Sequence, residues 1–277
     1  MVLEEQMLDE GPGRHKDSAF NELRADRGAK FDFDAIFDRV FIINLSSRKD
    51  RLLEMEWQLN MVGVPLEDST IEIFDAIQPK YAGEFPSIGA RGCFLSHLAI
   101  LEKAVEQNLN SILILEDDTS WSRSALYDVT DLARILNSVE WDLLHGGDGS
   151  DASSKSAMRL QLQRPSNELQ MAHFVGFRGG AIQIAHRYLS DLLTRPAGAP
   201  NGGPMHVDGA YCWLRKHHRE LDTYKCVPSI AKQRPSLSDI SPPTGLKGNM
   251  LISRGLAVIR RIRKFFDWHR SKQYRGS

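Results

Sequence analysis

The sequence predicts an α/β fold with a mostly parallel central sheet. Short apolar segments of strand length alternate with longer segments in which apolar residues recur at helical spacing. Strand and helix alternating in this way is typical of parallel sheets, because each helix carries the chain back to the start of the next strand. The 277 residues, 42% of them hydrophobic and 26% charged, have the composition of a soluble globular domain with a sizeable core.

The regular part of this pattern lies in the first half of the chain. Strands are predicted where short apolar runs end at polar or turn residues, and helices where apolar residues share one face. Ser46 or Ser47 is expected to cap the first helix, and Gly63 to end it. The predicted elements are strand 40–45, helix 52–62, strand 70–74, helix 94–105, strand 111–115, helix 126–136 and strand 141–144.

The second half of the chain is less regular, and its elements are predicted with fewer signals. A strand-like segment contains glycines at 176, 179 and 180, and a proline-punctuated stretch reads as extended. The predicted elements are strand 174–184, helix 186–193, helix 207–218 and extended segment 228–243.

The ends of the chain differ in composition from the middle. Residues 1–32 are polar and read as a disordered or loosely attached leader, residues 33–245 as the folded domain, and residues 246–277 as a basic amphipathic tail. The net charge is −1, yet residues 251–277 hold eight Lys or Arg against one acid. The charge of the tail therefore has to be interpreted separately from that of the domain.

Three cysteines, Cys93, Cys212 and Cys226, cannot all pair, and their spacing fits no metal or redox motif. The N-terminus lacks the apolar region of a signal peptide, and no run of 18 apolar residues occurs. We therefore expect a reduced, cytoplasmic protein, peripheral to the inner face of the cytoplasmic membrane if its tail docks there.

Three consecutive carboxylates follow the apolar strand that ends at Leu115. Glu116, Asp117 and Asp118 repel one another unless solvent or a cation relieves them. Hard ions such as Mn²⁺ or Mg²⁺ take oxygen ligands and bind through carboxylates together with a substrate's phosphates. Ligands of parallel sheets sit beyond the carboxyl ends of the strands, which is where this triplet lies. The alternative is a solvated acidic turn.

Two further segments are candidates for contact with an anionic ligand. Arg48 and Arg51 follow the first strand just after Asn44, and a guanidinium suits phosphate oxygens. Ser96 and His97 lie in a segment expected to open a helix, where free N–H groups favour anions. Ordinary surface ion pairs and a structural histidine are the alternatives.

Read together, these segments resemble glycosyltransferase family 25, which includes lipooligosaccharide and collagen galactosyltransferases. Four motifs match in order over about residues 38–145: Ile42-Ile43-Asn44-Leu45 with Arg48, Asp50 and Arg51; Phe74-Asp75-Ala76; Gly92-Cys93-Phe94-Leu95-Ser96-His97; and Ile114-Leu115-Glu116-Asp117-Asp118. Weaker matches follow at Gly179-Gly180-Ala181, His206-Val207-Asp208, Gln233 and Ser238-Asp239-Ile240.

The resemblance implies a single GT-A (Rossmann-like) domain that binds a nucleotide-sugar, UDP-galactose above all, through Mn²⁺ or Mg²⁺. By the same resemblance, Asp118, with Asp117 and Glu116, would hold the metal that bridges the donor diphosphate. Glu116 and Asp117 would also contact the donor, and its other contacts would be Asn44, Leu45, Arg48, Arg51, Ser96, His97 and Gly180.

The resemblance also implies inversion at the anomeric carbon, which needs a base to deprotonate the acceptor hydroxyl. Asp208 is the first candidate, because it follows a glycine- and proline-rich loop that could border the acceptor. Asp148, within a glycine-rich segment, is the second. Asp208 as a further metal ligand, as an acceptor contact, or as a plain helix-capping residue, stays open.

The implied acceptor is a glycan or lipid-linked oligosaccharide of lipopolysaccharide or another surface polysaccharide. Residues 251–274 carry apolar side chains on one helical face and basic ones opposite, which suits an anionic membrane surface. Packing of this helix on its own domain is the alternative. Nucleic acid is not an expected partner, because the tail shows no stacking platform or known binding motif.

Two other functions compete with transfer. One is a catalytically silent module of the same fold that binds nucleotide-sugar or glycan. The other is a metal-dependent phosphohydrolase, although the additional metal-binding pairs typical of that chemistry were not found. The complete triplet and both arginines favour the transferase.

Overall fold

The structure is a computed structural model that describes residues 31–122, 131–147, 160–166, 168–169 and 171–234. The predicted tail at 246–277 and the candidate base Asp148 lie outside the described residues. Within the leader predicted at 1–32, Phe31 is 1% exposed and packs in a tilted arrangement against Phe33, with ring centroids 4.3 Å apart.

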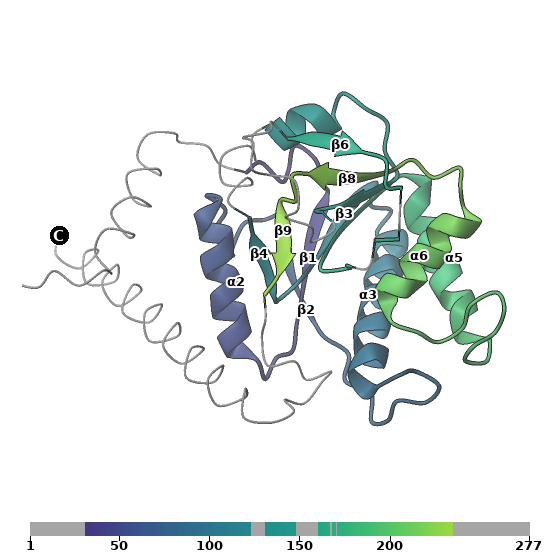
Figure 1. The fold of residues 1–277 in the computed structure, drawn as a ribbon. Coiled ribbons are helices and arrows are strands. Elements are labelled where there is room, and N and C mark those ends of the chain that lie inside the picture. The colour runs from purple at the N-terminus through teal and green to yellow at the C-terminus, as the bar shows by residue number, and fades with distance from the viewer. Residues whose placement is uncertain (1–30, 123–130, 148–159, 167, 170, 235–277) are drawn as a thin grey trace, which may run out of the picture.

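A seven-stranded sheet forms the centre of the domain (Figure 1). Five strands run in one direction, while β7 and β6 run against their neighbours, so the prediction of a mostly parallel sheet is confirmed. The spatial order is β2 (Ile71–Asp75), β1 (Arg39–Asn44), β3 (Ser111–Glu116), β7 (Phe174–Arg178), β5 (Leu143–His145), β8 (Thr223–Val227) and β6 (Gln161–Gln163).

Helices cover both faces of this sheet, which completes an α/β fold of three layers (Figure 1). Helix α2 (Lys49–Met61) lies on one face, and helices α3 (Ile88–Glu106), α5 (Gly180–Leu193) and α6 (Val207–His217) lie on the other. Alternate residues of a strand point to opposite faces. Phe41 and Ile43 accordingly join the core of the three-helix side, and Val40 and Ile42 join the core of the α2 side.

Several predicted boundaries shift for local reasons. The strand expected over 174–184 ends at Arg178, because Gly179 has a positive φ of 58° and α5 begins at the next residue. Neither Ser46 nor Ser47 caps α2, whose N-cap is Arg48 without a side-chain cap. The strand expected over 141–144 is found at β5, and residues 131–136 are helical within the helix expected at 126–136.

Helix α3 begins earlier than the sequence predicts. Its N-cap is Ser87, whose hydroxyl accepts a hydrogen bond from the amide of Ala90. Ser96 and His97 therefore lie beyond the first two turns, where the backbone N–H groups are bonded within the helix. The expected anion site at a helix start is not formed by these two residues.

A second, two-stranded sheet joins distant parts of the sequence. Strand β4 (Thr119–Trp121) follows the acidic triplet directly and pairs antiparallel with β9 (Ala231–Gln233). The end of the described chain is thereby held against the residues that follow the triplet.

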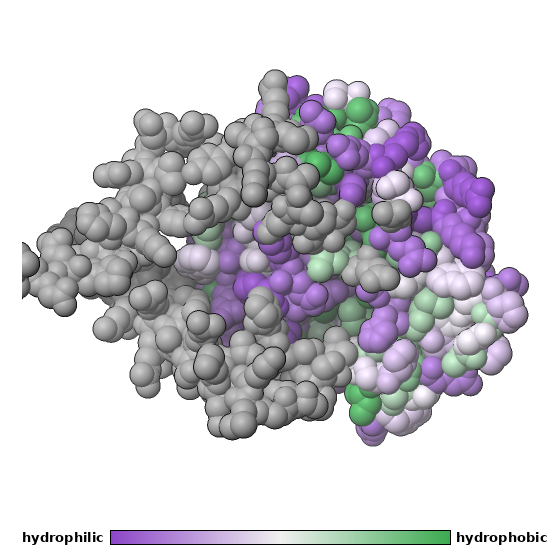
Figure 2. Space-filling model, in the orientation of Figure 1, coloured by the Kyte–Doolittle hydropathy of each residue, from purple (hydrophilic) through white to green (hydrophobic). Residues whose placement is uncertain are grey.

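No helix among the described residues has the length and hydropathy needed to cross a bilayer. On the face seen in Figure 2, the described residues mix hydrophilic and hydrophobic side chains.

Candidate functional site

The carboxyl ends of β1, β2 and β3 meet at one edge of the sheet, because the three strands are parallel and adjacent. A cavity of about 400 Å³ opens there. It is lined by the end of β1 and start of α2 (Ile43, Leu45, Ser47, Arg48, Arg51), the segment Ala76–Pro79, one face of α3 (Ile88, Gly89, Gly92, Cys93, Ser96), the triplet, and Gln233. All four motifs singled out in the sequence contribute residues to this cavity, the second of them only through Ala76.

The three carboxylates of the triplet have different surroundings. Glu116 faces α3, where its Oε1 lies 3.5 Å from Nε2 of His97 and 3.6 Å from Sγ of Cys93. Burial alone would raise the pKa of Glu116, but the neighbouring His97 and His173 rings and the Cys93 thiol lower it overall. Glu116 is thus held as a carboxylate at neutral pH.

Asp117 is occupied by protein donors. Its Oδ2 accepts a hydrogen bond from Nδ2 of Asn44 at 2.8 Å, and its Oδ1 accepts one from Nη1 of Arg51 at 2.9 Å. Burial nevertheless raises the pKa of Asp117 above its ordinary value, with Arg51 and Asn44 opposing that shift. The predicted donor contacts Asn44 and Arg51 therefore also fix Asp117, which makes it a poorer metal ligand than its neighbour.

Asp118 is the carboxylate that lacks a full set of partners. Its Oδ2 accepts a hydrogen bond from Nε2 of Gln233 at 3.1 Å, but its buried Oδ1 has no hydrogen-bond partner among the described residues. Burial, with the charges of Glu116 and Asp117, raises the pKa of Asp118 to about 6. A cation beside Oδ1 would supply the missing partner and remove this penalty.

The residues present thus fit a hard divalent ion. Asp118 would hold it, with Glu116 at the other end of the triplet, and the remaining positions would be left to water and to phosphate oxygens. Both carboxylates border the cavity, so a diphosphate there can reach the same ion.

The turn that carries the triplet is clamped by Arg234, a residue that sequence reasoning missed. Its guanidinium donates to the carbonyl of Asp117 at 2.6 Å and to that of Thr119 at 2.8 Å, and lies 3.3 Å from Glu54 of α2. The adjacent Gln233, singled out as part of a weak motif, was the signal that pointed to this strand. Strand β9 therefore sets the orientation of Asp118 from two positions.

Replacing Arg234 with glutamine is expected to lower the free energy of unfolding by about 2–3 kcal/mol, because two buried carbonyls and Glu54 lose their partner. Urea denaturation would measure this loss. Arg164→Gln is the matched control: its guanidinium is exposed and pairs with exposed Asp222, so little change is expected. Equal stability of the two variants would show that the clamp does not hold the triplet.

The other predicted donor contacts lie at the cavity in different roles. Leu45, Arg48 and Ser96 line it. Arg48 forms a two-pronged ion pair with Asp50, at 3.0 and 3.1 Å. Ser96 donates to the carbonyl of Gly92 and accepts from the amide of Ile77, so its hydroxyl ties α3 to the cavity wall. His97 is fully buried behind Glu116.

Gly180 does not join this site, which corrects its prediction as a donor contact. Strand β7 is antiparallel to β3, with Phe174 opposite Leu115 and Arg178 opposite Ser111. The amide of Gly179 accordingly bonds to the carbonyl of Asn110, at the start of β3. Gly180 therefore lies beside the start of β3, whereas the triplet lies at its end.

Asp208 lies near the cavity without lining it. It is in the first turn of α6, and its Oδ1 accepts a hydrogen bond from the amide of Gly209. Burial is the main reason that the pKa values of Cys93 and Cys212 are raised, and the charge of Asp208 contributes to both shifts. Asp208 and Cys212 are four residues apart on α6, and the charge of Asp208 also acts on Cys93, which lines the cavity.

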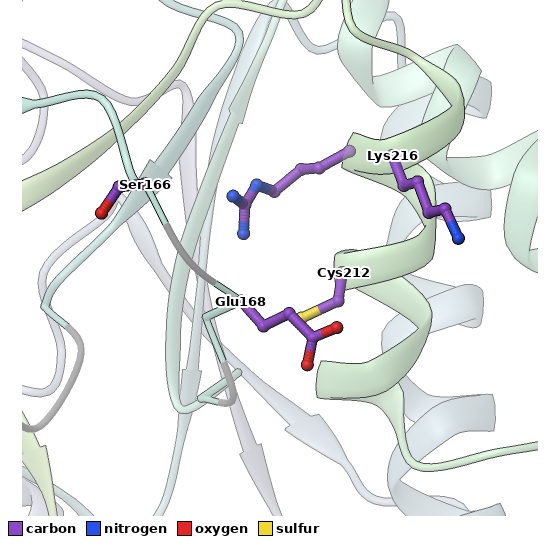
Figure 3. A pocket seen from close by; sticks show the side chains of 5 residues that line it. Ser166, Glu168, Cys212 and Lys216 are labelled. Atoms are coloured by element: carbon purple, nitrogen blue, oxygen red, sulfur yellow. The ribbon is translucent and has the colours of Figure 1, made fainter.

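Cys212 borders a second cavity of about 630 Å³. Figure 3 shows Glu168 reaching towards Cys212 from the strand side, with Ser166 farther along the same segment and Lys216 on α6 pointing away. Arg215 completes the described lining. Asp208 thus lies near one residue of each cavity.

Two buried histidines stand behind the triplet, and neither was singled out in the sequence. The backbone carbonyl of His173 accepts hydrogen bonds from the amide of Glu116 and the hydroxyl of Thr119. Burial, followed by the charge of Arg215, lowers the pKa of His145 to about 3, and burial lowers that of His173. Burial thus favours the neutral form of both rings.

Comparison with known proteins agrees with the motif analysis. The sequence profile described as glycosyltransferase family 25 (LPS biosynthesis protein) matches residues 37–163. The chain is 31% identical over 134 residues to inactive glycosyltransferase 25 family member 3 of Homo sapiens, covering 40% of this chain and 22% of that protein. It is 29% identical over 155 residues to procollagen galactosyltransferase 1 of Danio rerio, covering 50% of this chain and 24% of that protein.

Among solved structures, a glycosyltransferase involved in the glycosylation of the major capsid of PBCV-1 is similar at 14% identity. The match covers 68% of this chain and 81% of that chain with a TM-score of 0.37. The chain spans less than a quarter of the length of the two curated relatives described above. The matched region contains β1, the triplet and all of the residues that line the cavity except Gln233, and this region of the chain is similar to glycosyltransferase family 25.

Proposed function

We propose that this protein is a metal-dependent inverting glycosyltransferase that moves galactose from UDP-galactose to a glycan of lipopolysaccharide or another surface polysaccharide. The observation that carries the proposal is the cavity itself, whose lining combines Asp118, with its unpartnered carboxylate oxygen, and the guanidinium groups of Arg48 and Arg51. A nucleoside diphosphate needs this pairing of a cation site with guanidinium groups. The family match and the procollagen galactosyltransferases among the relatives support the sugar-transfer reading.

In this mechanism residues that line the cavity bind the donor. Arg48 and Arg51 face the diphosphate, and Asn44 holds Asp117 so that Arg51 stays in place. When bound, the metal acts as a Lewis acid that stabilises the departing diphosphate. Gln233 and Arg234 fix the Asp118 carboxylate before the donor arrives, which lowers the cost of organising the site.

The acceptor would enter from the side of α6. Asp208 lies near both cavities, and an acceptor hydroxyl placed between them would have this carboxylate as its base. The second cavity, with Arg215 and Lys216 against Glu168, then receives the rest of the glycan. The cytoplasmic location and the docking of the tail on an anionic membrane stay predictions from the sequence.

A panel of nucleotide-sugars tests the proposal directly. Purified protein is incubated with each donor in Mn²⁺, Mg²⁺ or EDTA, and both nucleotide release and donor binding are measured. Metal-dependent release from UDP-galactose, increased by a lipooligosaccharide acceptor, is the expected result.

The same panel separates the alternatives. A silent module, of which a relative named as inactive is an example, binds a donor but releases no nucleotide with any acceptor. A phosphohydrolase releases inorganic phosphate at a rate that no acceptor increases. Absence of nucleotide-sugar binding even with Mn²⁺ would overturn the assignment of the cavity.

A further inference from the structure

A mixed cluster of sulfur, nitrogen and oxygen ligands lies on the α3 side of the triplet. Cys93 and His97 are four residues apart on α3 and therefore share one face of that helix. Glu116 ends β3 opposite this face. One ligand atom from each of the three side chains lies within 4.8 Å of the others.

Two of the three ligand separations match those of a tetrahedral metal site. Zinc bonds of about 2.3 Å to sulfur, 2.0–2.1 Å to nitrogen and 2.0–2.2 Å to oxygen place tetrahedral ligands about 3.4 Å apart for nitrogen and oxygen, and about 3.6 Å apart for sulfur and oxygen. The observed distances to Oε1 of Glu116 are 3.5 Å from Nε2 of His97 and 3.6 Å from Sγ of Cys93. No backbone movement is needed to bring these two pairs to bonding geometry.

The histidine is also oriented as a ligand. Its Nδ1 lies 3.0 Å from the hydroxyl of Tyr211 on α6, and both side chains are almost fully buried. Its Nε2 is buried, points to the cluster and has no hydrogen-bond partner among the described residues. Ligating histidines characteristically have the second nitrogen fixed by such a partner. Without a metal, the polar neighbour of this nitrogen is Oε1 of Glu116, 3.5 Å away.

We propose that Cys93, His97 and Glu116 form a second metal site, selective for borderline-soft divalent ions of the Zn²⁺ class. Thiolate and imidazole ligands favour such ions, whereas Mg²⁺ and Mn²⁺ favour oxygen alone. Binding forms the metal–sulfur bond as the Cys93 thiol releases its proton to solvent. Cys93 and Glu116 line the cavity, so the fourth position faces it and is filled by water.

This site shares Glu116 with the proposed Mn²⁺ site, and the consequence for activity rests on the proposed function. A Zn²⁺ ion held by Cys93 and His97 keeps Glu116 on the α3 side, where its Oε1 already lies, and so withholds it from the diphosphate side. Zn²⁺ therefore inhibits transfer, and excess Mn²⁺ does not restore it readily because Mn²⁺ competes poorly for the sulfur ligand.

Cobalt is the probe, because a thiolate bound to Co²⁺ gives an intense charge-transfer absorption. The full chain, stripped with EDTA and kept reduced, is titrated with Co²⁺ in the absence of any donor. One equivalent is expected to produce the absorption, and Zn²⁺ but not Mn²⁺ is expected to displace it. Cys93→Ser should abolish it, and His97→Gln should weaken Co²⁺ binding at least about 10-fold.

Cys212→Ser is the matched control, since Cys212 is also partly buried and lies outside the cluster. It should leave the absorption intact. If Cys93→Ser fails to fold, Glu116→Gln tests the same ligand set through its carboxylate. No absorption in the wild type, its loss in Cys212→Ser, or easy displacement by Mn²⁺ would each overturn the site. Because no donor is present, these results stand apart from the transferase assay.

Discussion

Asp118→Asn is expected to abolish the response of the protein to Mn²⁺ while making the metal-free protein more stable. The buried carboxylate has one oxygen without a partner and a pKa raised to about 6 by burial and by Glu116. An asparagine carries no charge and can still accept the hydrogen bond from Gln233. The residue that costs stability in the empty site is then the one that the metal requires.

The sign of the pH dependence follows from that raised pKa. Below pH 4 Asp118 is protonated in both the folded and the unfolded chain, so it contributes no difference in stability. Between pH 4 and 6 the unfolded chain loses the proton first, and folding is progressively penalised. Above pH 6 the penalty is complete, and about two pKa units correspond to about 3 kcal/mol at most.

At pH 7.5 the metal-free Asp118→Asn variant should therefore unfold with a free energy about 1–3 kcal/mol higher than wild type. The difference should shrink as the pH falls towards 4 and vanish only well below the unfolded pKa of 3.8. Mn²⁺ should raise the melting temperature of wild type but not of the variant, since only a ligand bound to the folded state stabilises it. Transfer should fall about 10³-fold, because the metal supplies several kcal/mol to the departing diphosphate.

Asp191→Asn is the matched control, because Asp191 is exposed on α5 and away from the site. It should change neither stability nor the Mn²⁺ response. An Asp118→Asn variant that is still stabilised by Mn²⁺ as strongly as wild type would exclude Asp118 as a ligand.

The framework of the fold could be predicted because burial on both faces leaves a readable pattern. The strands at 39–44 and 111–116 are nearly continuous apolar runs, and one set of alternate residues packs on α2 while the other packs on α3, α5 and α6. What the pattern does not contain is strand direction. The antiparallel β7 has the same kind of apolar residues as a parallel strand, so no local pattern shows that Gly180, expected at the donor from the resemblance, lies at the other end of β3.

The parts of the site that could be predicted are those whose residues lie close to a strand end in the sequence. The triplet and the arginines after β1 stand within a few residues of a strand end, and topology alone brings them together. Arg234 is separated from the triplet by more than 110 residues, and its clamp exists only because β9 pairs with β4. Asp117 is held by Arg51 of α2 and Asp118 by Gln233 of β9. No local sequence pattern reveals these distant partners, so the different roles of the two carboxylates could not be predicted.

Asp208→Asn is expected to lower the rate of transfer about 10²–10⁴-fold, the usual contribution of a positioned base. The amide keeps the shape of the side chain and its hydrogen bond to Gly209 but cannot take a proton from the acceptor. As an acid in the first turn of α6, Asp208 also interacts with the helix dipole, so a loss of about 0.3–1 kcal/mol of stability is expected as well. That loss is too small to explain the fall in rate.

Separate measurements of kcat and donor affinity decide between the roles left open for Asp208. A base acts only on the acceptor, so the variant should bind UDP-galactose with Mn²⁺ as tightly as wild type while kcat falls. If Asp208 is instead a metal ligand, its replacement should weaken the binding of both Mn²⁺ and the donor. If Asp208 only caps α6, its replacement should leave both kcat and donor affinity unchanged once the amount of folded protein is taken into account. The first outcome would place the acceptor hydroxyl between the two cavities, because the charge of Asp208 reaches Cys93 on one side and Cys212 on the other.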